Sequence, residues 1–445
     1  MASAHRIHIS PEDTGLWGVK QTDGVAKKVT ELLQKDLDVF HVYFNDRGFH
    51  NHIVHHLLAL YGTGADAEAI QHGFDGNTGY QLPAKPTHKD VVEDLQTWSH
   101  ASKYLGRGQH YPDFLAFFQR EIEQKGWEAV VTEYLLSGSE AAEDLFVRLY
   151  AGVLHPLIQL MYAMEWAQPA IVAEALAQTC VHHDNLKKEL FAAENMANEA
   201  HGRAPAARMP SIASLLREVR DQPKLGKELA NEARYNLHDT IFKRAGDEML
   251  EILSKVKVRP DEVEERTAEM FDANMFMAAG ASFRPNKVNK FDFFLIEGRT
   301  DSLRMASHHP NSAPISVTFN SQSWIPAETK ARLLEWKIRY DLLEYAAGGV
   351  PELSLDQIKA YQPKNQGTAS IAEIASKIAL IPDDGHAIKL ARAAGICQEV
   401  TKKYQDKDWV LIKGDDMWAK INHMILDSLQ SPGGYWVRGG GAHEL

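Results

Sequence analysis

The sequence lacks several features that define common protein classes. Its 445 residues include only two cysteines, Cys180 and Cys397, which excludes a disulfide framework and a thiolate zinc site. No segment has the eighteen uninterrupted apolar residues of a transmembrane helix, and the first residues lack the apolar core of a secretory signal. The net charge of -12, without a basic stripe, argues against a nucleic-acid surface. We therefore expect a cytoplasmic protein that binds neither membranes nor nucleic acid.

Nucleotide-binding and zinc-metalloprotease motifs are also scarce. The chain has no G-x-x-x-x-G-K-[ST] or H-E-x-x-H sequence, and only residues 62–67, Gly-Thr-Gly-Ala-Asp-Ala, match G-x-G-x-x-A. That dinucleotide fingerprint requires a β-strand before the glycines. Here an apolar segment with helical spacing precedes them, so we interpret these glycines as the C-cap of a helix.

Histidine is abundant, with 21 residues, and four of them, His50, His52, His55 and His56, lie within residues 49–62. In a helix, His52 and His56 would lie one turn apart with His55 beside them. Buried imidazoles are costly unless each has a partner, and a metal ion can serve several at once. The alternative is a partly exposed cluster at a helix start, with one or two core histidines bonded to carbonyls.

Apolar periodicity predicts an all-α fold, a single large helical domain with its site gathered from several helices in the core. We expect an N-terminal arm over residues 1–24, the helical domain over 25–430 and a Gly-rich tail over 431–445. Residues 73–80 are predicted as a loop, and 315–319 as one possible short strand. A long helix is predicted over 140–166, and we expect Pro156 to kink or restart it.

Polar side chains follow one side of that long apolar helix, at His155, Gln159, Tyr162 and Glu165. Such a stripe indicates a pocket, while the alternative is a core histidine paired with Gln159. Further histidines in apolar surroundings occur at 308–309 and at 386. Four distant segments that each deliver a buried imidazole favour one metal site. A non-enzymatic helical binding protein with structural histidines is the alternative.

Five separated motifs in residues 40–405 resemble those of the questin oxidase-like family of fungal oxygenases, and in particular its anthraquinone ring-cleavage branch. The motifs are Asn51-His52, the segment 151–158 around His155, His308-x-x-Asn311-Ser312, Leu334-Glu335-Trp336-Lys337 and Asp384-Gly385-His386-Ala387-x-Lys389. The resemblance implies a non-haem iron dioxygenase that cleaves a C–C bond of a polyketide anthraquinone, or of its reduced form, with dioxygen as co-substrate.

The resemblance also implies the ligands of the Fe(II) ion, which are His52, His155, His308, His386 and a carboxylated Lys377. His52 is preferred to His55 and His56 because of the Asn-His pair, and His308 is preferred to His309. Lys377 lies among Ile374, Ala375 and Ile378, where desolvation would lower the pKa of its amine.

Where relatives carry a second histidine, this chain has Gln159, which we expect to orient His155 or to contact substrate. Tyr162 and Glu165 are the other expected polar contacts to the substrate. The resemblance leaves a second activity open, an NADPH-dependent Baeyer–Villiger monooxygenase acting on an anthraquinone such as questin. Because no nucleotide-binding fold is predicted, NADPH would act indirectly, through a separate reductase.

Overall fold

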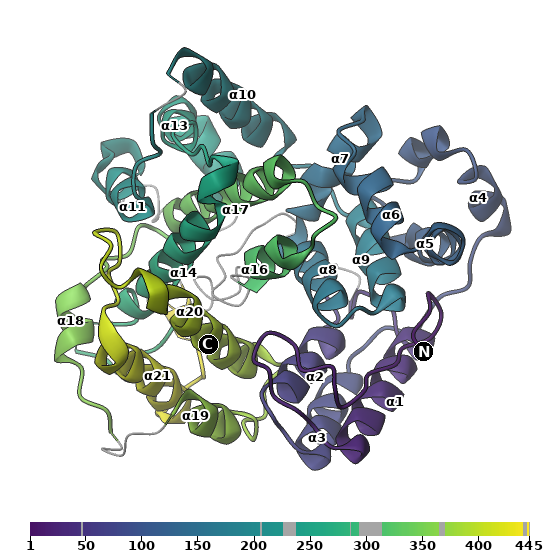
Figure 1. Ribbon diagram of the computed structural model, residues 1–445, viewed down its shortest axis with the longest axis horizontal. Coiled ribbons are helices and arrows are strands. Elements are labelled where there is room, and N and C mark those ends of the chain that lie inside the picture. The colour runs from purple at the N-terminus through teal and green to yellow at the C-terminus, as the bar shows by residue number, and fades with distance from the viewer. Residues whose placement is uncertain are drawn as a thin grey trace. The chain divides into compact units, whose positions relative to one another are not determined.

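The computed structural model describes residues 1–45, 48–204, 207–225, 237–284, 286–292, 314–364, 370–438 and 443–444. Those residues are mostly helical (Figure 1), which confirms the predicted all-α class. Two antiparallel two-residue strands pair near the C-terminus, β1 (Val437–Arg438) and β2 (His443–Glu444). The chain divides into two compact units, residues 1–187 with 379–389, and residues 188–378 with 390–445. The single domain expected over residues 25–430 remains a prediction.

The first unit is built from helices α1 to α9 and the first residues of α20. Its α-helices are α1 (Asp23–Val39), α2 (Ile53–Gly62), α3 (Ala67–Thr78), α4 (Lys89–Asp94), α5 (Tyr111–Lys125), α6 (Trp127–Val131), α7 (Glu140–Leu149), α8 (His155–Glu165), α9 (Pro169–Val181) and α20 (His386–Thr401). Short helical turns join them, namely η1 (Trp98–Lys103), η2 (Gly108–His110), η3 (Thr132–Leu136) and η4 (Gly152–Leu154). Helix α9 is buried almost throughout and packs against α5 and α8.

Helices α1, α2 and α3 pack against one another (Figure 1). The predicted C-cap is confirmed, since α2 ends at Gly62 and Gly64 has a φ of +89°. The predicted loop over residues 73–80 is wrong, because α3 continues to Thr78. Gly73 lies inside α3, where an added Cβ would be 2.8 Å from Leu60 Cδ1 and 3.2 Å from His56 Cε1. This glycine therefore permits close packing of α3 on α2, which outweighs its poor helix propensity.

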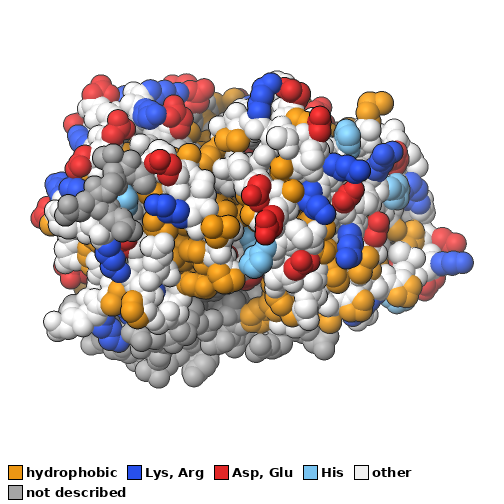
Figure 2. All heavy atoms as spheres, turned by 90° about the horizontal axis from the view of Figure 1, so that it is seen from below, with side chains coloured by type: hydrophobic (Ala, Val, Ile, Leu, Met, Phe, Trp, Pro, Cys, Tyr) orange, Lys and Arg blue, Asp and Glu red, His pale blue; other side chains and the backbone are white. Residues whose placement is uncertain are grey.

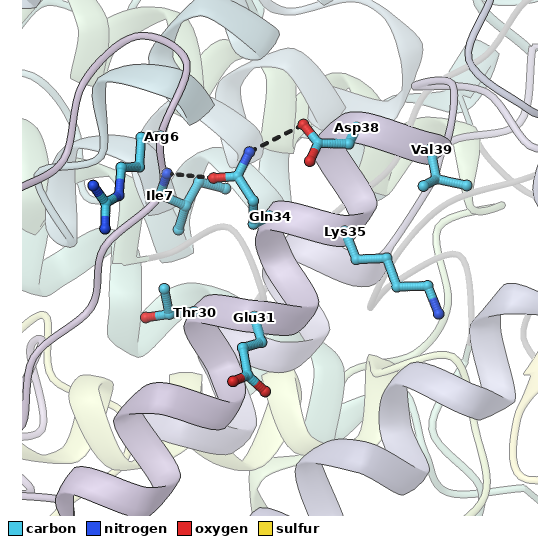
Figure 3. Close-up of a pocket in the computed structure, with 8 residues that line it drawn as sticks. All are labelled: Arg6, Ile7, Thr30, Glu31, Gln34, Lys35, Asp38 and Val39. Atoms are coloured by element: carbon cyan, nitrogen blue, oxygen red, sulfur yellow. Dashed lines mark hydrogen bonds between the residues drawn. The ribbon is translucent and has the colours of Figure 1, made fainter.

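The N-terminal arm is fixed to the first unit. Its backbone N–H groups at Ala4, Ile7 and His8 donate hydrogen bonds of 2.8 to 2.9 Å to side chains of Glu123, Gln34 and Gln168. Ala4 and Ile7 are also buried. A shallow surface hollow of about 430 Å³ lies between the arm and α1 (Figure 3). Residues of both charge signs line it and no histidine does, so it is not a candidate for the chemistry indicated by the sequence.

The long helix expected over residues 140–166 is broken between α7 and α8. Gly152, Val153 and Leu154 have consecutive positive φ values of 53°, 64° and 58°, and α8 then starts at His155 with Pro156 in its first turn. The predicted restart at Pro156 is confirmed. Left-handed backbone at a branched residue costs about 1–3 kcal/mol, and such strain is concentrated at functional sites. Here it places His155 at the first position of a buried helix.

The second unit is helical as well, and its long helices α14 and α17 are buried over most of their length. It contains α10 (Lys187–Arg203), α11 (Ile212–Asp221), η5 (Pro223–Leu225), α13 (Leu237–Leu253), η6 (Pro260–Glu262), α14 (Val263–Gly280), α16 (Pro314–Ser321), α17 (Ala327–Ala347), α18 (Leu355–Ala360), α19 (Ile371–Ile378), η7 (Lys402–Tyr404) and α21 (Gly414–Gln430). The strand considered over residues 315–319 is wrong, because α16 occupies them. Ile315, Thr318 and Phe319 are buried at helical spacing, so their packing outweighs their β propensity.

On the face drawn in Figure 2, described basic side chains are interspersed with acidic ones and form no continuous stripe. In the described part of the chain, no single helix is long and apolar enough to cross a membrane. One bent pair, α7 with η4 and α8, passes by length and composition.

Candidate metal centre

The centre of the first unit holds two histidine rings in direct contact. His52 is the N-cap residue of α2 and His155 begins α8. Their Nε2 atoms are 3.0 Å apart, and the rings are nearly parallel with centroids separated by 5.1 Å. Both side chains are buried. The sequence placed both residues in the site, and the structure brings them together although 103 residues separate them along the chain.

The other nitrogen of each ring has an oxygen beside it. His155 Nδ1 donates to the carbonyl oxygen of Gly152 at 2.9 Å, and His52 Nδ1 lies 3.1 Å from a carboxylate oxygen of Asp384. A carbonyl and an ionised carboxylate only accept hydrogen bonds, so the proton of each neutral ring belongs on Nδ1. The two Nε2 lone pairs then face one another. A metal-ligating histidine is oriented in this way by a carbonyl or carboxylate behind it.

Sharing a proton between the two Nε2 atoms is disfavoured. Burial lowers the pKa of His155 well below its usual value, and the neighbouring His50 lowers it further. Burial and the Lys389 charge likewise lower the pKa of His52. Two nitrogens bound at about 2.1 Å to one cation, at right angles, lie about 3.0 Å apart. The spacing of the two Nε2 atoms therefore fits a shared metal ion.

His386 and Asp384 approach the same pair from the N-terminus of α20. One Asp384 oxygen faces His52, and the other accepts a hydrogen bond from His386 Nδ1. The rings of His52 and His386 are 4.9 Å apart and perpendicular. Burial acts to raise the pKa of Asp384, but His52 and Lys389 beside it lower that pKa overall. The ionised carboxylate thus orients two imidazoles at once.

His55 and Lys389 complete the cluster, and the sequence prediction had assigned neither to the metal. His52, His55 and His155 each offer a nitrogen within 4.8 Å of the others. The Lys389 amine is 3.3 Å from His55 Nδ1 and its side chain is buried. Burial lowers the pKa of Lys389 to about 8, although Asp384 and Asp383 act to raise it. A sequence signal for Lys389 existed, because it lies one turn after His386 in an apolar run.

A second layer of histidines lies against the first. The His50 ring stacks on His155 at 3.9 Å with an interplanar angle of 9°. His50 Nε2 is 2.9 Å from His182 Nε2. The His182 ring occupies the space next to Gly152, where an added Cβ would lie 2.3 Å from it. His182 therefore helps to fix the strained turn before His155.

Asn51, the residue before His52, fixes the backbone at the start of α2. Its Oδ1 accepts from Ile53 N at 2.9 Å, which caps the start of α2, and its Nδ2 donates to Asp36 Oδ1 at 2.7 Å. Asp36 is buried, and burial raises its pKa to about 7. Burial and the charge of Asp36 both raise the pKa of the buried Glu174. Asn51 therefore ties the backbone at His52 to helix α1.

The remaining predicted residues have different surroundings. The Gln159 side chain donates to Glu174 at 3.3 Å, and Glu165 accepts from the Leu16 backbone at 2.7 Å, so it holds the arm. The Tyr162 ring is buried with its centroid 6.1 Å from that of His55. Tyr162 therefore lies beside the histidine cluster.

Lys377 requires a correction. It lies in α19 of the second unit and is exposed, whereas Ile374, Ala375 and Ile378 form the buried face of that helix. The premise that its amine is desolvated is therefore wrong. His308, and His309 as its alternative, lie outside the described residues.

Comparison with known proteins agrees with the resemblance inferred from the motifs. The model of the questin oxidase-like family matches residues 49–394. A Baeyer–Villiger oxidase, ptaJ, of Pestalotiopsis fici is 33% identical over 433 residues, covering 96% of this chain and 94% of its own. A questin oxidase of Aspergillus fumigatus is 33% identical over 442 residues, with the same coverage of each chain. The oxidoreductase AflY of Aspergillus parasiticus is 34% identical over 418 residues, covering 93% and 81%.

Proposed function

Because this chain belongs to the questin oxidase-like family, we propose that it is a metal-dependent oxygenase of Baeyer–Villiger type that acts on a polyketide anthraquinone. That it is an oxidoreductase rests on the relatives, which are named as oxidases, monooxygenases and an oxidoreductase. The non-enzymatic alternative has no such support. The observation that carries the metal dependence is the approach of His52 and His155, Nε2 to Nε2, at 3.0 Å inside a buried histidine cluster.

We propose that His52, His55, His155 and His386 hold the metal, with Lys389 in the role expected of Lys377. Four imidazoles and one oxygen ligand suit Fe(II) among the common metals. Carboxylation of Lys389 would supply that oxygen. Its neutral amine forms a C–N bond with carbon dioxide, one proton leaves, and an anionic carbamate results. Two observations support Lys389 in this role. Its side chain is buried, and its amine lies 3.3 Å from His55 Nδ1.

Bound Fe(II) would supply the one-electron activation of dioxygen, because dioxygen on its own reacts only slowly with organic substrates. The protein's own groups do the rest. Asp384 keeps the protons of His52 and His386 on Nδ1, so that both Nε2 atoms point away from the carboxylate. The histidines and Lys389 of the cluster are buried, which strengthens the polar contacts among them. The Tyr162 hydroxyl is our candidate for a hydrogen bond to the substrate.

The proposed reaction inserts one oxygen atom between a ring carbonyl carbon and its neighbour. The ketone, dioxygen, NADPH and one proton give the ester, NADP⁺ and water, so one C–C bond breaks and two C–O bonds form in its place. NADPH would deliver its two electrons through a separate reductase. The only G-x-G-x-x-A stretch forms the end of α2, without the strand that a dinucleotide site requires.

A second candidate is the dioxygenase that the sequence motifs imply. It would cleave the reduced anthraquinone and place both oxygen atoms in the product, so that no NADPH is consumed during cleavage. Two features favour it, the histidine cluster that could hold a metal and the helix, rather than a strand, before the G-x-G-x-x-A stretch. The names of the relatives favour the Baeyer–Villiger reaction.

Isotope labelling separates the two reactions. The protein is reconstituted anaerobically with ferrous iron and given questin, or its reduced form, under ¹⁸O₂, with and without NADPH and a reductase. One labelled oxygen in the ring-expanded ester, or in the ring-opened acid that its hydrolysis by unlabelled water yields, with NADPH consumed, supports the proposal. Two labelled oxygens without NADPH consumption support the dioxygenase. No turnover by a protein with a full metal complement would refute both.

Paired lysine variants test the revised assignment. Lys389→Met removes the buried amine and should abolish iron binding or lower activity at least tenfold, whereas Lys377→Met, on the exposed face of α19, should behave as wild type. Loss of iron only in Lys377→Met would restore the original prediction.

A further inference from the structure

A second cluster of metal-ligating side chains joins the starts of α4 and α5. His88 is the N-cap residue of α4, His110 precedes α5, and Asp113 lies in the first turn of α5. Their placement follows from local structure, since His110 and Asp113 are three residues apart at a helix start and share one face. None of the three contacts the principal histidine cluster in any recorded interaction.

The three side chains converge on one carboxylate oxygen. His88 Nδ1 and His110 Nδ1 lie 2.9 and 2.8 Å from Asp113 Oδ2. The other oxygen, Oδ1, accepts from the His88 backbone N–H at 2.6 Å. The Asp113 side chain is fully buried and that of His110 is 9% exposed, but His88 is 53% exposed. The cluster is therefore anchored on its buried side and open to solvent at His88.

The three ligand atoms are close enough to share one cation after a small adjustment. Tetrahedral ligand atoms at about 2.1 Å from a zinc-type cation are about 3.4 Å apart, so each nitrogen would move about 0.5 Å away from the Asp113 oxygen when a cation binds. Either nitrogen of a neutral imidazole can carry its proton. Moving the protons from Nδ1 to Nε2 would thus free two lone pairs beside the carboxylate without any change in net charge.

The local charge also favours a cation. The hydrogen bond that Tyr104 donates to Asp94 raises the pKa of its hydroxyl, and the charges of Asp90 and Asp113 raise it further; the Tyr104 ring lies 5.0 Å from that of His110. Asp94 is largely neutralised by contacts with His100 and Lys103. Asp113 is itself a proposed ligand, and Asp90 adds a further negative charge to this segment.

We propose that His88, His110 and Asp113 form a second metal site, which binds a divalent cation of the zinc type and clamps α4 to α5. Two imidazole nitrogens and one carboxylate oxygen are ordinary zinc ligands, and solvent at His88 supplies the fourth position. The clamp closes residues 88–113, so binding should stabilise this segment. The inference is independent of the proposed function.

Zinc titration of the full chain tests this proposal, and His100 provides a matched control. His100 is a partly exposed histidine of the same segment that pairs with Asp94 at 2.7 Å but has no third ligand. Zn²⁺ is titrated against a chromogenic chelator for wild type, His88→Ala and His100→Ala. We expect His88→Ala to bind one equivalent fewer, or at least tenfold more weakly at one site. His100→Ala should match wild type.

Two further measurements keep the test decisive. The zinc-dependent rise in Tm should shrink in His88→Ala and persist in His100→Ala, because only the former opens the clamp. In a His155→Ala background, which removes a ligand of the principal cluster, the equivalent that depends on His88 should still bind. Superimposable titrations for wild type and His88→Ala would overturn the proposal, as would equal losses in the two alanine variants.

Discussion

Asp384→Asn tests how the histidine cluster is oriented. One oxygen of the wild-type carboxylate lies 3.1 Å from His52 Nδ1, and the other accepts a hydrogen bond from His386 Nδ1. An asparagine of the same shape keeps one accepting oxygen but presents an NH₂ group to the second imidazole. Two donors then face one another, and that ring must turn or move its proton to Nε2, which removes a lone pair from the metal.

The structure gives the expected magnitude. Loss of a group that orients one metal-bound histidine lowers metal affinity about 10–100-fold, which corresponds to about 1.4–2.7 kcal/mol. If both imidazoles lost their orientation independently, the losses would multiply to about 10²–10⁴-fold. Because asparagine still orients one ring, we expect the lower range for Asp384→Asn.

The neighbouring carboxylate provides the control. Asp383 accepts only backbone hydrogen bonds in the recorded contacts, from Gly385 N at 2.9 Å and from Ala387 N at 2.7 Å. Asp383→Asn should weaken the cap of α20 but leave both imidazoles oriented. The assay is anaerobic Fe(II) competition with a chelator. Equal affinity of wild type and Asp384→Asn within about twofold, or an equal loss in Asp383→Asn, would refute the reasoning.

Three further predictions concern packing, capping and pH. Gly73→Ala should lower stability by about 1–2 kcal/mol despite better helix propensity, because its Cβ meets Leu60 and His56; thermal unfolding measures this. Asn51→Ala should cost about 1 kcal/mol from the lost cap of α2 and weaken Fe(II) binding, and unchanged values would exclude it as a positioning residue. The buried Asp272 has its pKa raised by burial to about 7. Its protonation therefore favours the folded state below pH 7, and that contribution is lost as pH rises from about 4 to 7, by about 4 kcal/mol in total. Asp272→Asn should remove this slope in urea unfolding, and an identical pH dependence in wild type would contradict the assignment.

Much of the fold follows from local sequence patterns. The amphipathic spacing of α1, the glycine cap of α2 and the restart at Pro156 depend on interactions between residues a few positions apart. The errors arose where tertiary packing decides. Helix α3 includes Gly73 because α2 approaches it closely, and α16 replaces a strand because its apolar side chains are buried at helical spacing.

The candidate site was likewise predicted in part, and the error again arose where tertiary packing decides. Sequence motifs identified His52, His155 and His386, which the structure brings into contact with one another or with Asp384. They misplaced the lysine, because apolar neighbours in sequence do not show which side of a short helix is buried. Lys377 and Lys389 both lie among apolar residues, but of the two only Lys389 points into the core.

Metal content tests the central claim most directly. Wild type and His155→Ala are reconstituted anaerobically with Fe(II), freed of loosely bound metal and analysed for iron, with circular dichroism to verify equal helix content. We predict about one equivalent of iron in the wild type and less than about half of that in His155→Ala, because one imidazole of the buried pair is gone. A wild-type protein without bound iron, or an equal iron content in a folded His155→Ala variant, would contradict a metal centre built on this cluster.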